Sequence, residues 1–386
     1  MLERSLYVAL VASSVTLVAC GSGGSSSSGG SPGTPPGAGP PSGSPNSPPS
    51  GAVDMAMAPP IVDGGAPADL AAAPPSDLAP GAPRWSAEPS GVADDLAAVW
   101  GSGASDVFAV GANGRILHST GAGAWTPRAS GRATALTAVW GNAASDVFIA
   151  AADGATLHSD DGASFTAAGA TAATPFLGAS RGDDVLAATM QPLQLFHSTD
   201  HGLHYTVVQV NVPTAAVGPE TLFAPGGPTV FGAGCFMTFA CQAFRSDDSG
   251  ATWNHTTLMT GGAGHVYPDV VAIFSRGDDV YILINIVGPD SAGSPVSSYV
   301  VHSADGGASY KVGTAMMGTL GALWSSEPGD LWLAGDAGLV AHSTDGGMTL
   351  ARVTVPSAAN LRAVWGSAAD DVYAVGAGGA ILHFHR

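Results

Sequence analysis

The sequence predicts an all-β protein built as a seven-bladed β-propeller of four-stranded antiparallel blades, and two features lead to this prediction. First, the stretch from Leu96 to Trp125 recurs along the chain, with further copies starting at Leu136, Leu320 and Leu361. A fixed period of this size is typical of repeat folds, in which each copy buries its apolar faces against its neighbours. Second, past residue 84, short alternating apolar runs are separated by Gly, Asp and Asn, which is the pattern of short strands joined by tight turns.

Each repeat divides into four strands, named a to d in chain order. In the first copy strand a begins at Leu96, strand b at Asp106, strand c at Arg115 and strand d at Trp125. Strand b identifies seven copies, which begin at Asp106, Asp146, Asp184, near Thr229, and at Asp279, Asp330 and Asp371. Glycine, Asp and Asn in the intervening segments supply the backbone conformations that tight turns need.

The seventh copy lacks a strand d, because the chain ends shortly after its strand c. The missing strand is expected at the other end of the domain. Trp85 precedes Leu96 by 11 residues, just as Trp125 precedes Leu136 by 11. We therefore expect residues 84–89 to complete the last blade and to close the ring, so that residues 84–386 form one monomeric propeller with only short, protected sheet edges.

The first 20 residues have the features of an export signal. Arg4 is followed by mostly apolar residues over a length too short for a comfortable membrane span. The segment ends in LVAC at Cys20, which resembles the bacterial lipobox, in which the Cys thiol receives a diacylglyceryl group. The resemblance implies a signal peptide over residues 1–19, lipidation of Cys20 and a membrane anchor; Gly21 in place of Asp implies the outer membrane. A cleaved signal with a Cys there by chance is the alternative.

Residues 20–83 have the composition of a tether. Of the 28 Pro residues in the chain, 15 lie between Gly21 and Pro83, among Gly, Ser and Ala. Such a segment cannot bury enough apolar surface to fold, and as a flexible chain it would span roughly 45 Å. The tether would thus separate the propeller from the membrane.

The net charge of −18, from 30 acidic and 12 basic residues, argues against one class of partner. A field of that sign repels polyanions, so we do not expect nucleic-acid binding. No sequence motif indicates a cofactor.

The c–d turns carry the most specific motif in the sequence. They read SDDGASF, STDHGLHY, SDDSGATW, SADGGASY and STDGGMTL, and the first copy has Gly121 in place of the Asp. These turns resemble the Asp-box, S-x-D-x-G-x-T-W, of the sialidase-like and photosystem II assembly factor-like β-propellers. The residues at the Ser and Asp positions are Ser159, Asp161, Ser198, Asp200, Ser246, Asp248, Ser303, Asp305, Ser343 and Asp345. The resemblance implies a structural role at the rim, and one carboxylate per turn is too few for a Ca²⁺ site.

Two further positions recur in the repeats. Histidine precedes the Ser of the turn motif at His118, His158, His197, His302 and His342, and again at His383. Equivalent positions lie around a ring, whereas zinc ligands must converge on one point, so we expect core or turn-bonding histidines and no metal site. The aromatic position in strand a, at Trp100, Trp140, Phe274, Trp324 and Trp365, predicts packing between blades.

A glycoside hydrolase of the sialidase-like class is the alternative function that the resemblance raises. Such an enzyme would need an Arg triad, a Tyr nucleophile with a Glu partner, and an Arg-Ile-Pro segment. No Arg-Ile-Pro occurs, and the predicted domain contains three glutamates, Glu88, Glu220 and Glu327. A pair of aspartates could take the place of the glutamate, so this alternative stays open, but we expect no catalytic activity.

Departures from the repeat indicate where a partner would bind, because a regular scaffold commonly carries its function on irregular loops. Cys235 and Cys241 flank the b–c hairpin of the fourth blade and predict a disulfide in an oxidising compartment. Insertions in the b–c and d–a connections of the fourth and fifth blades contain an apolar set, namely Phe236, Met237, Phe239, Met259, His265 and Tyr267. We expect this set to contact an envelope protein or a glycan. The sequence therefore predicts a lipid-anchored binding or assembly module of the cell envelope.

Overall fold

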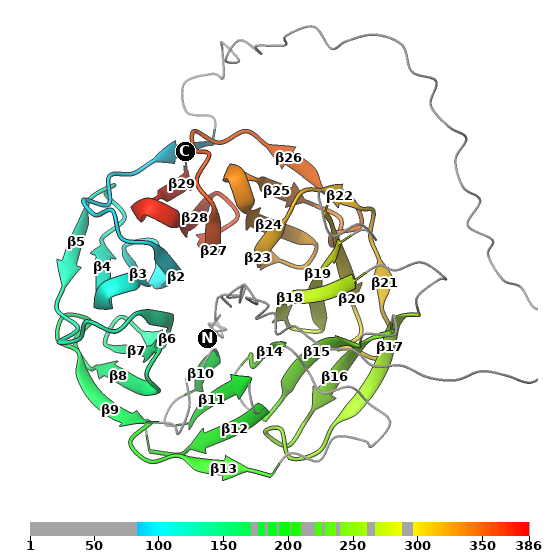
Figure 1. The fold of residues 1–386 in the computed structure, drawn as a ribbon, viewed down its shortest axis with the longest axis horizontal. Helices are drawn as coiled ribbons and strands as arrows, with labels where there is room; N and C mark the ends of the chain where they lie inside the picture. Colours follow the sequence, from blue (N-terminus) through cyan, green and yellow to red (C-terminus); the bar gives the residue numbers. More distant parts are fainter. Residues whose placement is uncertain are drawn as a thin grey trace, which may run out of the picture. The chain divides into compact units, whose positions relative to one another are not determined.

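The computed structural model shows seven antiparallel sheets of four strands each, arranged as blades around a ring (Figure 1). One sheet has an extra two-residue strand. The predicted all-β, seven-bladed architecture is confirmed. The residues that the structure describes are 83–170, 177–181, 184–190, 193–200, 202–209, 221–225, 228–236, 240–260, 267–287 and 296–385.

In every blade, strand a lies nearest the axis of the ring and strand d lies at the rim (Figure 1). The first blade contains β2 (Leu96–Gly103), β3 (Asp106–Gly111), β4 (Arg115–Ser119) and β5 (Trp125–Arg128). The second contains β6 (Leu136–Ala143), β7 (Asp146–Ala151), β8 (Ala155–Ser159) and β9 (Thr166–Ala170). The third contains β10 (Leu177–Arg181), β11 (Asp184–Met190), β12 (Leu193–Ser198) and β13 (Thr206–Val208).

The fourth blade contains β14 (Thr221–Phe223), β15 (Val230–Phe236), β16 (Ala240–Ser246) and β17 (Asn254–Thr260). The fifth contains β18 (Tyr267–Arg276), β19 (Asp279–Val287), β20 (Ser297–Ser303), β21 (Lys311–Val312) and the extra strand β22 (Met316–Met317). The sixth contains β23 (Leu320–Glu327), β24 (Asp330–Gly335), β25 (Val340–Ser343) and β26 (Ala351–Val353). The seventh contains β27 (Leu361–Ala368), β28 (Asp371–Gly376), β29 (Ile381–His385) and β1 (Arg84–Ala87).

Strands close to the axis of the ring are more buried than strands at the rim. In β3, for example, all residues after Asp106 are buried, because neighbouring blades cover both faces of the sheet. Such a strand is expected to be a continuous apolar run, as DVFAVG is. The outer strand β26 instead has mostly exposed side chains. The core is therefore a ring of contacts between blades.

The aromatic residue of strand a determines which residue can follow in the next blade. A Cβ added to Gly101 would lie 2.6 Å from Cη2 of Trp365, a residue of the preceding blade. The same relation holds for Gly141 with Trp100 and for Gly366 with Trp324. Each indole thus fills the space that a side chain would otherwise occupy. This is the inter-blade packing that the recurring aromatic position predicted.

Two junctions of the fifth and sixth blades show the complementary case. There the equivalent small residue is a buried serine, Ser275 or Ser325, and the preceding blade carries Phe223 or Phe274 in place of Trp. A phenyl ring is smaller than an indole, and serine is larger than glycine. The two changes compensate each other in volume, as close packing in a protein core favours.

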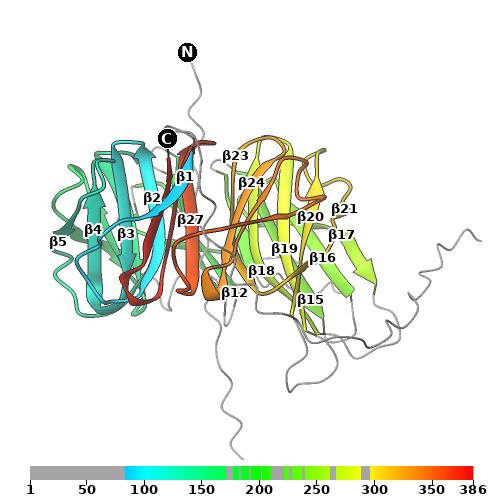
Figure 2. The same cartoon turned by 90° about the horizontal axis from the view of Figure 1, so that it is seen from above.

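The last blade contains strands from both ends of the domain. β1 pairs in antiparallel fashion with β29, with Trp85 opposite Phe384, and forms the outer strand of that sheet (Figure 2). The Trp85 ring also contacts Trp332 of the sixth blade edge-on, with ring centroids 5.4 Å apart. That this strand is what keeps the ring closed in solution stays a prediction.

The Trp–Gly packing can be tested at Gly101. In Gly101→Ala, the new methyl group would clash with Trp365 and with the carbonyl oxygen of Asp106, 2.5 Å away. We expect the free energy of unfolding to fall by about 1–3 kcal/mol, the usual cost of overpacking, measured by chemical denaturation. Gly103→Ala is the matched control, because a Cβ at Gly103 in the same strand has no neighbour within 4 Å. Equal stability of the two variants would contradict this account of the packing.

Candidate functional site

The ring has two faces that differ in regularity. The a–b and c–d turns share one face, here called the turn face; for example, the Gly346 N–H of a c–d turn donates to the Gly329 carbonyl of an a–b turn over 2.9 Å. The b–c and d–a connections share the other, the loop face, where the Gly338 N–H donates to the Ala359 carbonyl over 2.9 Å. A partner site on either face must be built from these connections.

On the turn face, the c–d turns are held by one repeated set of hydrogen bonds. In the fourth blade, the Ser246 hydroxyl donates to Asp248 Oδ1 over 2.8 Å and accepts from the N–H of Gly250 over 2.8 Å. Asp248 Oδ1 also accepts from the N–H of Thr252 over 2.8 Å. The other turns with the full spacing repeat this arrangement at Ser198 and Asp200, Ser303 and Asp305, and Ser343 and Asp345.

Two turns depart from the full set. At Ser159 the turn is one residue shorter, and Asp161 Oδ1 accepts from the N–H groups of Ala163 and Ser164 over 2.8 and 2.7 Å. In the first blade, which has Gly121 in place of Asp, the Gly121 N–H donates to the Ser119 hydroxyl over 3.2 Å. The carboxylates of these turns are therefore engaged in holding the backbone.

Hydrogen bonds keep the turn carboxyls ionised. The N–H of Ser164 and that of Ala163 lower the pKa of Asp161 to about 2, and the backbone N–H of His204 lowers the pKa of Asp200 to about 2. The side-chain hydroxyls of Thr252 and Ser309 act in the same way on Asp248 and Asp305, each with a pKa of about 2. These carboxylates therefore stay ionised well below the pH at which an ordinary aspartate is protonated.

A second repeated arrangement lies beneath the turn face. In five blades, Nε2 of the strand c histidine lies within 2.5–2.9 Å of Oδ1 of the aspartate that opens strand b. The pairs are His118 with Asp106, His158 with Asp146, His302 with Asp279, His342 with Asp330, and His383 with Asp371. A hydroxyl or amide from the end of strand a, such as Ser102, donates to the other oxygen of several of these aspartates.

Each of these histidine rings also lies against the aromatic side chain of strand b. Ring centroids are 4.6 Å apart for Phe108 and His118 and 3.9 Å apart for Tyr373 and His383. Each of these five histidines therefore lies in a different blade and is paired with its own aspartate. Among the described residues, no three His, Cys, Asp or Glu side chains are grouped so that they could hold a metal ion.

Sequence reasoning did not anticipate the His–Asp pairs, although a signal for them exists. In four of the five pairs the aspartate and the histidine are 12 residues apart, and a longer b–c connection raises the separation to 23 in the fifth blade. In the ladder, the histidine stands opposite the aromatic residue two positions after the aspartate, as His118 does opposite Phe108. The constant spacing thus reflects the register of strands b and c.

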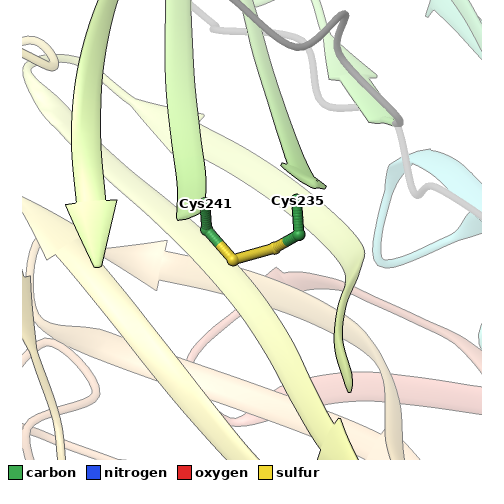
Figure 3. Close-up of a disulfide and its surroundings, with 2 residues drawn as sticks. All are labelled: Cys235 and Cys241. Carbon is green, nitrogen blue, oxygen red and sulfur yellow. A yellow bond between two sulfur atoms is a disulfide. The ribbon is translucent and has the colours of Figure 1, made fainter. Parts of the chain in front are cut away.

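The loop face is where the chain departs from its repeat. Cys235 in β15 and Cys241 in β16 are opposite residues in the ladder and form a disulfide, as predicted, with Cα atoms 4.0 Å apart (Figure 3). Regular b–c turns occupy the same position in other blades: η1 (Ala112–Gly114), η2 (Asp336–Gly338) and η3 (Ala377–Gly379). The disulfide therefore fixes a hairpin whose sequence differs from the repeat.

The predicted partner-binding set is described only in part. Phe236 ends β15, Met259 lies near the end of β17 and Tyr267 opens β18, so these backbone positions are at strand ends on the loop face. Met237, Phe239 and His265 lie outside the described residues, as does Cys20.

Between the fourth and fifth blades, a pocket of about 160 Å³ is lined by Arg245, Asn254 and Thr256 and by the c–d turn at Gly306. The Arg245 guanidinium is already engaged, because it donates to the Gly306 carbonyl over 2.7 Å and pairs with Asp247.

Within the part of the chain that the structure describes, no helix has the length and apolarity to cross a membrane.

Comparison with known proteins identifies the fold but not a family. No protein-family model matches the chain, and no curated protein matches it in sequence. A solved structure of YCF48 bound to D1 peptide is similar over 78% of this chain and 97% of its own, with 16% identity and a TM-score of 0.59. YCF48 from Cyanidioschyzon merolae gives 14% identity and a TM-score of 0.53, covering 78% of this chain and 98% of its own. The WD40 propeller domain of Doa1 gives 11% identity and a TM-score of 0.53, covering 79% and 97%.

The role of the turn carboxylates can be tested at two adjacent aspartates. Asp161 accepts three hydrogen bonds, whereas the side chain of its neighbour Asp160 is 92% exposed. We expect Asp161→Asn to lower the melting temperature at pH 7 and Asp160→Asn to leave it nearly unchanged. Because the pKa of Asp161 is lowered in the folded state, its stabilisation is present above its ordinary value of 3.8 and is lost as the pH falls towards about 2. Melting curves from pH 2 to 7 should therefore converge for Asp161→Asn and the wild type at the acid end; a constant difference would contradict the assignment.

Proposed function

We propose that this chain is an exported, lipid-anchored β-propeller that binds a protein partner in the bacterial cell envelope without catalysing a reaction. The observation that carries the proposal is the disulfide between Cys235 and Cys241 on the loop face. Structural disulfides persist in oxidising compartments such as the periplasm and the cell surface, so the bond supports export. It also joins the ends of β15 and β16 where they enter the b–c connection of the fourth blade, and such a crosslink lowers the entropy that binding would cost.

The scaffold itself favours recognition by the loop face. The turn face repeats one hydrogen-bonded turn, and in five blades its carboxylates are engaged with their own backbone. The loop face instead carries connections of different length and sequence on a rigid ring. Binding sites commonly occupy such loops. The fold is shared with YCF48, which has been solved bound to a D1 peptide, and this likeness supports a protein or peptide partner over a glycan.

The absence of a catalytic role is supported by how the reactive side chains are used. Among the described residues, the recurring histidines are paired with aspartates and stacked on aromatic rings, and the turn aspartates accept backbone hydrogen bonds. Neither set offers the two opposed carboxyl groups that glycoside hydrolysis requires. A screen of fluorogenic glycosides should show no turnover, and measurable turnover would favour the hydrolase.

The partner site can be tested by crosslinking on intact cells followed by mass spectrometry. We expect a double variant, Phe236→Ser with Tyr267→Ser, to reduce recovery of the crosslinked partner by roughly 30-fold. This corresponds to a loss of about 2 kcal/mol of binding free energy, which is typical of a hot spot at an interface. Asp160→Asn on the turn face is the matched control and should retain the partner. Unchanged recovery in the double variant would exclude these residues from the interface, and recovery of a glycan in place of a protein would identify the other ligand class.

The anchor is tested separately. In Cys20→Ser the thiol that would receive the lipid is removed, while the propeller is untouched. We expect the protein to move from the membrane fraction to the soluble fraction with an unchanged melting temperature, because the change lies outside residues 84–386. Retention in the membrane fraction would contradict the lipid anchor without bearing on the partner site.

A further inference from the structure

The two ends of the domain meet at a buried carboxylate. Glu88 follows β1 directly, and its N–H donates to the carbonyl of Ile381 in β29 over 2.9 Å. Its side chain is 7% exposed, with Oε1 lying 2.7 Å from Nδ1 of His383. Oε2 accepts from the indole N–H of Trp125, in the outer strand of the first blade, over 2.7 Å. One side chain therefore joins the N-terminal strand to both the last blade and the first.

The second nitrogen of His383 faces another carboxylate. Nε2 lies 2.7 Å from Oδ1 of Asp371 in β28, and the histidine side chain is 6% exposed. An ionised carboxylate only accepts hydrogen bonds, so each ring nitrogen must carry a hydrogen to satisfy its partner. An imidazole with hydrogens on both nitrogens is a cation. The geometry of this junction is thus that of a buried imidazolium between two carboxylates.

The equivalent histidine of the first blade has a different neighbour. Nε2 of His118 lies 2.9 Å from Asp106, but Nδ1 lies 3.2 Å from Nη2 of Arg128. A guanidinium only donates hydrogen bonds, whereas the carboxylate beside Nδ1 of His383 only accepts them. Two histidines at the same position of the repeat therefore differ in the group that approaches Nδ1.

We propose that His383 is a protonated latch that fastens the N-terminal strand to the last blade and releases it when the ring loses its proton. A neutral His383 can donate to only one of its two carboxylates. The other would then face a lone pair while buried, which is costly. Glu88 is the partner that can leave, because it lies at the end of β1, whereas Asp371 is part of an inner strand.

Every element packed around the latch contributes to its titration. His383 faces Glu88 beside β1, Asp371 and Tyr373 from β28, His385 from its own strand, and the indole of Trp125, which donates to Glu88. Burial opposes the charge, but the hydrogen bonds to Asp371 and Glu88 outweigh it and raise the pKa of His383. A raised pKa means that the stabilisation is complete below the ordinary value of about 6.5 and is lost as the pH rises through the raised value.

The charge of His383 can be measured directly in the full chain by ¹⁵N NMR of the imidazole nitrogens. A protonated ring gives two similar ¹⁵N shifts, whereas a neutral ring gives two well-separated shifts. We expect His383 to show the protonated pattern at pH 7.5. Separated shifts for His383 at this pH would overturn the proposal, and this measurement on the wild type needs no variant to fold.

Two variants separate a latch from ordinary packing. Glu88→Gln keeps the shape of the side chain but removes its charge, and should move the titration of His383 to lower pH. In the wild type, the hydrogen-exchange rate of the β29 amides, corrected for its intrinsic pH dependence, should increase as the pH rises through the pKa of His383. The total increase should be up to about tenfold for each pH unit by which that pKa is raised. Asp106→Asn is the control at the equivalent His–Asp pair of the first blade, and should leave the titration of His383 unchanged. An unshifted titration in Glu88→Gln, or exchange in β29 independent of pH, would overturn the latch.

Discussion

Blade-to-blade packing near the axis is the contact on which the rest of the molecule depends. At three junctions the indole of one strand a packs against a glycine of the next blade, as Trp365 does against Gly101, where a methyl group would overlap the ring. The fourth and fifth blades carry Phe223 and Phe274 at this position, and β10 of the third blade carries Ala179. Neighbouring blades are thus packed near the axis by side chains whose volumes fit each other.

The polar side chains near the turn face form two repeated layers. The aspartate that opens strand b and the histidine of strand c satisfy each other close to the turn face, with an aromatic ring against the imidazole. Beyond them, the serine and aspartate of the c–d turn satisfy the backbone. The polar groups of these two layers thus form hydrogen bonds that stabilise the blades on the turn face. The connections of the loop face do not carry this repeated pattern and differ from blade to blade. The disulfide lies at one of these irregular connections, in the fourth blade.

Much of this architecture could be predicted because it is periodic. The number of blades, the strand order and the Ser-Asp turns all follow from residues that recur at short, regular intervals. The His–Asp pairs recur just as regularly, with Asp106 and His118 separated by 12 residues. They were missed because a spacing of 12 residues does not by itself indicate contact. The register of strands b and c is what brings the two side chains together. For the loop face, the sequence predicted only a set of apolar residues as a binding site. Irregular loops have no period from which their geometry could be predicted.

The sequence by itself determined the all-β class, the seven repeats, the turn motif and the pairing of Cys235 with Cys241, because each depends on neighbours close along the chain. The tertiary structure decided which groups surround the histidines. Glu88 and His383 are 295 residues apart and share no spacing with any other pair, yet they lie 2.7 Å apart in the fold. The group that approaches Nδ1 is a carboxylate at His383 and a guanidinium at His118. A repeat specifies the position of such a side chain, whereas its electrostatic state comes from residues that only the closed ring brings near.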